Sequence, residues 1–212
     1  MKQSRLFTGW RTRAGVAAVL VMGLLVGCGI IPQPQPAPQL YTLTPKSTFS
    51  DDVAAVDWQL GIEAPTAPAG LSSARIAVTR EPLTLEYYAG AQWVDDAPAM
   101  VQRLLIESFE NSGRIIGVGR LAVALRSDYV LQPELREFQA EYSPDSKAPN
   151  VRVRVNVKLI KMPERRIVAS DTFERVMEAP DNRMPVIVKT FDQALGKVMR
   201  DLVIWTLERG SR

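Results

Sequence analysis

The sequence contains no histidine and a single cysteine among its 212 residues. Without histidine, a Ser-His-Asp triad, a Cys-His pair, His-ligated zinc and the usual proton shuttle near neutral pH are all excluded. Carboxylate-pair and Ser-Lys chemistry stay formally open. The lone cysteine, Cys28, has no partner in the chain for a disulfide. The composition therefore favours a binding or assembly protein, without a cofactor, over an enzyme.

The N-terminus carries positive charge and no negative charge. Its four basic residues precede an apolar stretch from Ala14 to Val26, and small residues lead to Cys28. A basic region, a short apolar region and small residues before a cleavage point are typical of an export signal. The tetrad Leu25-Val26-Gly27-Cys28 also resembles a bacterial lipobox. This resemblance implies a signal peptide over residues 1–27, cleavage before Cys28 and lipidation of Cys28.

An uncleaved membrane helix is the alternative for this segment. Residues 14–31 contain no charge, and as a helix they would span about 27 Å of a hydrocarbon core about 30 Å thick. Gly15, Gly23, Gly27 and Pro32 make the segment a poor permanent anchor. The basic side stays in the cytoplasm in either case, so the rest of the chain is expected outside it.

The overall basic character belongs to this leader. Four of the 26 Lys and Arg residues lie before Cys28, whereas none of the 23 Asp and Glu residues does. The remaining chain therefore has a net charge of about −1, and the sequence pI near 9.1 is no argument for nucleic acid. Because no basic cluster interleaved with aromatics follows, nucleic-acid binding is not expected.

Three segments are predicted along the chain. Residues 1–27 form the signal peptide, residues 28–38 the lipidated cysteine and a Pro-rich tether, and residues 39–212 one folded domain. Alternating prolines from Pro32 to Pro38 favour an extended polyproline conformation. A Pro-rich ligand for a partner is the alternative to a simple tether.

Hydrophobic periodicity predicts an α+β domain. Expected strands cover residues 40–43, 58–62, 75–79, 83–88, 115–118 and 121–125, followed by three long strands near 129–142, 151–159 and 167–177. Apolar residues change parity near Arg136-Glu137, which predicts a β-bulge, and Pro133 marks an edge or a missing ladder bond. The fold class expected is a two-layer, mostly antiparallel sheet with a long three-stranded meander covered by two amphipathic helices.

The two helices have recognisable ends. The first follows Asp95-Asp96, which are expected to supply capping oxygens, and ends at Gly113 in a left-handed conformation. The aspartate pair is also compatible with a metal or acid–base site, but a helix cap explains it more simply. The second helix begins near Pro185, carries a long apolar stripe that includes Leu195 and Leu202, and is followed by Gly210.

An aromatic cluster is the candidate partner-binding site. Tyr87, Tyr88 and Trp93 are expected in a loop before the first helix. Packing in the core is the simpler explanation for such residues, but aromatics are also enriched at interfaces. A solvated strand face is the ordinary explanation for three cations on one face of a strand, with contact to lipid headgroups as the alternative (Arg152, Arg154 and Lys158).

The order and spacing of several motifs resemble a known family. They are the lipobox at Cys28, a Tyr41-x-Leu43 strand, the segments 75–78 and 83–88, Gln92-Trp93 before a helix with Leu104-Leu105, the Tyr129-Val130-Leu131 strand and a C-terminal amphipathic helix. Together they resemble the ABC-type transport auxiliary lipoproteins of the paraquat-inducible C type. Family members typically have Arg-Trp where this chain has Gln92-Trp93.

The resemblance implies a periplasm-facing lipoprotein that serves an ATP-driven transporter. Its partner would be an Mce-domain periplasmic protein that works with a permease and an ATPase. The cargo would be a lipid that moves between the two membranes. The resemblance implies no catalytic residue. A homo-oligomer is compatible with it. Gly29 replaces the aspartate that retains lipoproteins at the inner membrane of enteric bacteria, so the lipid anchor is expected in the outer membrane. The alternative is a structural envelope lipoprotein, such as a pilotin or an outer-membrane assembly factor.

Overall fold

The computed structural model describes residues 36–121 and 126–211. The predicted signal peptide, Cys28, most of the tether and most of the expected strand 121–125 lie outside the described residues. From Ala37 onward the chain forms one compact unit. In this part the elements are the strands β1 (Gln39–Tyr41), β2 (Val56–Ile62), β3 (Arg75–Thr79), β4 (Glu86–Trp93), β5 (Ile115–Arg120), β6 (Tyr129–Glu141), β7 (Asn150–Lys161) and β8 (Arg166–Glu178), and the helices α2 (Ala97–Ser112) and α3 (Met184–Gly210).

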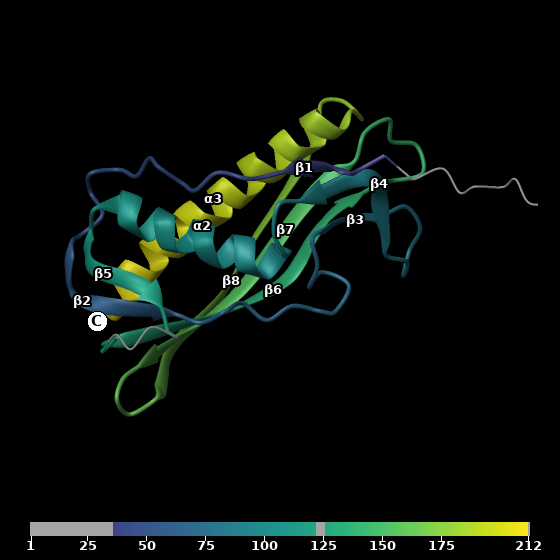
Figure 1. The fold of residues 1–212 in the computed structure, drawn as a ribbon. Coiled ribbons are helices and arrows are strands. Elements are labelled where there is room, and N and C mark those ends of the chain that lie inside the picture. Colours follow the sequence, from purple (N-terminus) through teal and green to yellow (C-terminus); the bar gives the residue numbers. More distant parts are fainter. Residues whose placement is uncertain (1–35, 122–125, 212) are drawn as a thin grey trace, which may run out of the picture. The chain divides into compact units, whose positions relative to one another are not determined.

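The expected two-layer α+β arrangement is confirmed. Both helices lie against one side of the sheet, and α3 crosses the long strands while α2 lies beside it (Figure 1). The sheet runs β1-β4-β3-β6-β2-β5, with β7 and then β8 on the other edge of β6. The meander β6–β7–β8 is antiparallel throughout, as is the β3–β4 pair. Four pairings are parallel (β1–β4, β2–β5, β2–β6 and β3–β6), so the sheet is mixed.

The parity change in β6 is the predicted bulge. The register of β6 against β7 shifts between Leu135 and Glu137, so the apolar side chains on both sides of the shift face the same layer. Leu135 and Phe138 are accordingly both buried.

Pro133 lies in the central strand rather than at an edge of the sheet. It pairs with Val157 of β7, while on its other side β6 leaves β2 at Leu131 and meets β3 only at Gln139. The carbonyl of Pro133 accepts the Thr66 backbone N–H in this gap at 3.1 Å. The missing N–H of proline is thus tolerated where the neighbouring strand changes.

The covered face of the meander is apolar. The alternate residues of β7 from Val151 to Leu159 are at most 2 % exposed. Leu195 and Leu202 of α3 are each 1 % exposed and belong to the same core, as the apolar stripe predicts. Burying a side chain of this size is worth about 1.5–3 kcal/mol. The helix α3 is therefore an integral layer of the domain.

The helix ends differ in detail from the sequence expectation. Asp96 occupies the N-cap position of α2, but its side chain makes no capping bond, so the predicted capping oxygens are wrong. The Asp96 carbonyl accepts the Met100 N–H at 2.9 Å, as the first helical bond. Gly113 ends α2 with φ 60°, as predicted. Gly210 is the last residue of α3, where a Cβ atom would lie 2.4 Å from the Trp58 ring. Close packing, and not helix termination, explains that glycine.

Candidate interaction surface

The predicted aromatic cluster lies on a bulged strand. Arg75 of β3 pairs with Gln92 and Ala77 pairs with Tyr87, so residues 88–91 of β4 oppose the single residue Ile76. Gly90 within this bulge has φ 68°, a conformation that glycine adopts at little cost. The sequence expectation of a loop from Tyr87 to Trp93 is therefore wrong, because the segment remains part of the sheet.

Trp93 is a core residue. Its side chain is 1 % exposed, and its ring centroid lies 5.5 Å from that of Phe138 and 5.3 Å from that of Phe191. Because the ring is enclosed by β6 and α3, it has no surface to offer a partner. Of the two alternatives weighed for Trp93, the geometry supports packing.

Tyr87 and Tyr88 are half-buried and held in place. The Tyr87 hydroxyl donates to the Gly70 carbonyl at 3.0 Å, and the Arg75 guanidinium lies 3.6 Å above the Tyr87 ring. The hydroxyls of Tyr88 and Tyr142 are 3.1 Å apart. Burial, with the hydrogen bond to Tyr142, raises the pKa of Tyr88 above its ordinary value, so the phenol keeps its proton to higher pH than an exposed tyrosine does. Partly exposed aromatic rings held in place by such contacts are suited to recognition.

A tight turn joins β3 to β4 beside these tyrosines. The Thr84 N–H and hydroxyl both donate to the Glu81 carbonyl, at 3.3 and 2.8 Å. Pro82 and Leu83 are the central residues, and Leu83 has φ 64°, as the third position of a type II turn requires. That position favours glycine, and a left-handed conformation costs about 1–2 kcal/mol for other residues. The Leu83 side chain is fully exposed and Leu85 is 42 % exposed.

The alternation of Leu83 and Leu85 had predicted a strand over residues 83–88. The strand begins only at Glu86. The signal for the turn was the proline at its second position. The apolar alternation outweighed it, although Leu83 is fully exposed and Leu85 packs only partly, beside Gly70.

Three of the charged candidates, Asp95, Arg152 and Arg154, have structural explanations. The Asp95 carboxylate accepts the Asp96 N–H at 2.9 Å, and the described residues contain no group of acidic side chains that could hold a metal. Arg152 pairs with Glu141 at 2.9 Å and also contacts Glu174. Arg154 pairs with Glu137 at 3.0 Å. These guanidinium groups are thus engaged within the sheet, and lipid headgroups are not needed to explain them.

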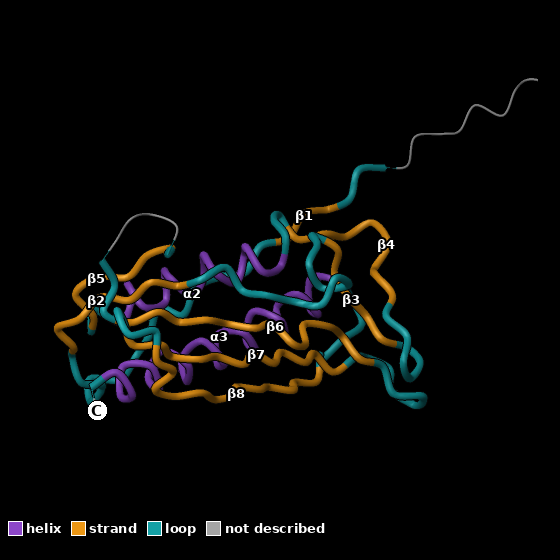
Figure 2. The backbone as a smooth tube through the Cα atoms, turned by 90° about the horizontal axis from the view of Figure 1, so that it is seen from below, coloured by secondary structure: helices purple, strands orange, loops and turns teal. Residues whose placement is uncertain are grey.

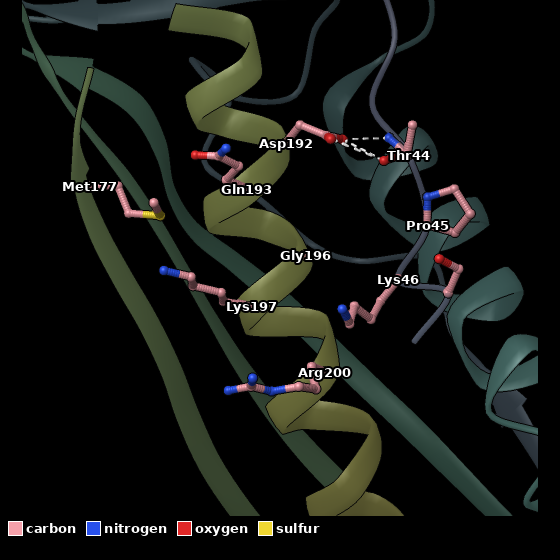
Figure 3. Close-up of a pocket in the computed structure, with 10 residues that line it drawn as sticks. Thr44, Pro45, Lys46, Met177, Asp192, Gln193, Gly196, Lys197 and Arg200 are labelled. Carbon is pink, nitrogen blue, oxygen red and sulfur yellow. Dashed lines mark hydrogen bonds between the residues drawn. The ribbon is translucent and has the colours of Figure 1, made fainter. Parts of the chain in front are cut away.

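A groove beside α3 was not anticipated from the sequence. It has a volume of about 490 Å³ and lies between residues 44–47, Met177 of β8 and the outer face of α3 (Figure 3). Asp192 accepts hydrogen bonds from the Thr44 backbone N–H and hydroxyl at 2.7 and 2.9 Å, which fixes one wall. Lys197 and Arg200 extend from α3 toward β8, and Lys46 reaches the helix from the other side. The groove joins residues far apart in sequence, so no local pattern could reveal it.

None of the helices in the described ranges combines the length and hydropathy that crossing a membrane would require.

Comparison with known proteins identifies the family. The model of the ABC-type transport auxiliary lipoprotein component matches residues 41–203. The chain belongs to this family. The match includes all the strands from β2 to β8, α2 and most of α3, and so covers both candidate surfaces.

Solved structures of two other proteins support the fold of this auxiliary lipoprotein. A crystal structure of a Xanthomonas campestris protein is 34 % identical, with a TM-score of 0.77, covering 82 % of this chain and 97 % of that one. An uncharacterised crystal structure at 12 % identity has a TM-score of 0.63, covering 79 % of this chain and 97 % of that one.

One curated relative is longer than the aligned region. An uncharacterised Bradyrhizobium diazoefficiens protein is 25 % identical over 120 residues, 57 % of this chain. The alignment spans 32 % of that relative, about a third of its length.

Proposed function

We propose that this protein is the lipid-anchored auxiliary component of an ABC-type lipid transporter, acting between the inner and outer membranes by binding. The family match over residues 41–203 carries the proposal. The absence of histidine from the whole sequence is consistent with a role in recognition, without catalysis or a cofactor.

Cys28 supplies the anchor in this proposal. One acyl chain gives marginal membrane binding, and each further chain adds about 0.8 kcal/mol per buried CH₂, so a multiply acylated Cys28 would stay in the bilayer. Gly29 in place of aspartate favours the outer membrane, with the folded domain facing the periplasm. Metabolic labelling with a palmitate analogue should mark the wild-type protein and not Cys28→Ser. Equal labelling of both proteins would contradict the anchor.

The partner is an Mce-domain periplasmic protein associated with a permease and an ATPase. The proposed contact surface is the bulged part of β4 with Tyr87 and Tyr88, because both rings are held by polar contacts yet remain partly accessible. Trp93 supports this surface from the core and does not contact the partner.

Affinity capture tests the partner. Full-length lipidated protein should recover an Mce-domain protein with its permease and ATPase from envelope extracts. Ala89→Arg places a long cation on the exposed bulge beside Tyr88 and should reduce the capture, with an unchanged melting temperature. Ile116→Arg is the matched control, because Ile116 is 67 % exposed on β5 at the other end of the sheet. Recovery of only secretion or pilus components would favour a structural envelope lipoprotein instead.

A further inference from the structure

The turn between β3 and β4 contains an apolar side chain that folding does not explain. Leu83 has a relative exposure of 107 % and φ 64°. It therefore occupies a conformation that favours glycine and buries nothing in return. A residue that is strained and exposed at once points to a role outside the isolated fold. Leu85, two residues later, lies partly against Gly70 and is 42 % exposed.

The polar groups around this turn are largely neutralised. Arg80 and Glu86, which flank the two leucines, form an ion pair at 2.9 Å. The Glu81 carbonyl accepts two hydrogen bonds from Thr84, one from its backbone N–H and one from its hydroxyl. Within residues 80–86 the carboxylate of Glu81 is the remaining charge. The tip of the turn is thus an apolar projection with a small net charge, suited to a zwitterionic surface.

The turn lies at the end of the domain where the chain enters. Gln39 of β1 pairs with Ala91 of β4, so the entering chain runs beside the bulge of β4. The start of β1 and the β3–β4 turn lie at the same end of the domain in both views, opposite to β5 (Figure 1, Figure 2). Residues 28–36 can span at most roughly 32 Å even when fully extended. If Cys28 is in the bilayer, this end of the domain cannot be far from its surface.

We infer that Leu83 and Leu85 insert into the lipid surface to which the protein is anchored. The inference rests on the proposed lipidation of Cys28 and adds to it a second, non-covalent membrane contact. This contact would fix the orientation of the domain, with the β3–β4 turn toward the lipid and β5 away from it. Two linked contacts reinforce each other, because the anchor raises the effective concentration of the turn at the surface.

A site-specific fluorophore tests the insertion. The sequence has no cysteine besides Cys28, so lipidated full-length Leu83→Cys offers one free thiol for an environment-sensitive dye such as NBD. The protein is reconstituted into vesicles of the zwitterionic lipids phosphatidylethanolamine and phosphatidylcholine. We expect a blue-shifted, several-fold brighter emission that nitroxide-labelled lipids quench. Ile116→Cys is the matched control and should show neither effect.

A second variant separates insertion from folding. Leu83→Gly removes the side chain and suits the left-handed conformation, so the protein should melt no lower than the wild type. In a protein that begins at Gly29, and so has neither leader nor lipidated cysteine, the residual binding to the same vesicles should fall several-fold on adding Leu83→Gly. Unchanged binding, or emission at residue 83 that remains that of an aqueous dye, overturns the inference.

The outcomes also distinguish this inference from the proposed function. Lack of palmitate labelling would show that the anchor itself fails. A blue shift at residue 83 that appears only when an Mce-domain protein is added would mean that the turn docks on that partner, and would overturn membrane insertion. Partner capture that is unaffected by Leu83→Gly is expected, since Tyr87 and Tyr88 stay in place.

Discussion

The two faces of the β6–β7–β8 meander differ sharply although they alternate along the same strands. On the face toward the helices, Val151, Val153 and Val157 are completely buried. On the open face, the side chain of Arg152 between them is 30 % exposed and is surrounded by the carboxylates of Glu137, Glu141 and Glu174. Hydrogen bonding to Glu141, opposed by burial, raises the pKa of Arg152 above its already high ordinary value.

This difference shows where the stability of the domain originates. Each valine buried under the helices contributes about 1.5–3 kcal/mol. Exposed ion pairs contribute about 0.2–1 kcal/mol because water and salt screen them. The ionic face is also incompletely paired, since the buried Arg154 Nε has no hydrogen-bond partner in the described part of the chain. The open face therefore favours solubility and register, and the covered face holds the layers together.

The strongest test of this difference is a truncation in the aromatic cluster of the covered face. Phe191→Ala removes a fully buried ring that contacts Trp93 and Phe138. We expect a loss of about 3–5 kcal/mol in the free energy of unfolding. Urea denaturation measures it, with Lys189→Ala on the exposed side of α3 as the control expected within about 0.5 kcal/mol. Equal effects at the two positions would mean that α3 does not form the covering layer.

Neighbouring residues of β7 provide a more direct comparison of the two faces. Val153→Ala should cost about 2 kcal/mol, through lost burial and a small cavity. Arg152→Ala should cost about 1 kcal/mol or less, and its effect should shrink further in high salt. Thermal melts at low and high salt measure both. A larger effect for Arg152→Ala would show that the ionic network stabilises the meander more than the valines do.

Two glycines of α3 allow the buried and outer sides of this helix to be compared. Gly210 faces the Trp58 ring, so Gly210→Ala forces an overpacked contact and should cost about 1–3 kcal/mol. A Cβ atom at Gly196, on the outer side, meets nothing within 4 Å. Gly196→Ala should therefore stabilise the protein by about 0.5–1 kcal/mol through helix propensity alone. Calorimetry on both variants should show melting shifts of opposite sign, and a shared sign would contradict this account.

Local sequence patterns predicted much of the fold because they reflect which residues share a face. Alternation in β7, the parity change at Leu135 and Glu137, and the stripe of α3 all depend on backbone periods of two or 3.6 residues. The structure confirms each of them. Gly113 could be placed for a similarly local reason, since its left-handed conformation ends a helix.

The candidate surface was less predictable, because the burial of a side chain depends on which other segments of the chain pack against it. Trp93 and Tyr88 lie five residues apart on β4, yet β6 and α3 enclose the first and leave the second partly open. Leu83 and Leu85 alternate like a strand, but Leu83 is fully exposed and Leu85 packs only partly, beside Gly70. The groove beside α3 likewise exists only because residues 44–47 return to residues 192–200.

The sequence by itself predicts a leader, a tether and a folded domain. It also determined the α+β alternation of the domain, which the structure confirms. These features are local, since they depend on charge, hydropathy and period within a few turns of chain. Only the tertiary structure decided the parallel pairings around β6, the burial of Trp93 and the exposure of Leu83. Each of these features depends on whether segments far apart in sequence contact each other. The hydrophobic effect is non-directional, so an apolar side chain does not by itself specify which segment will cover it.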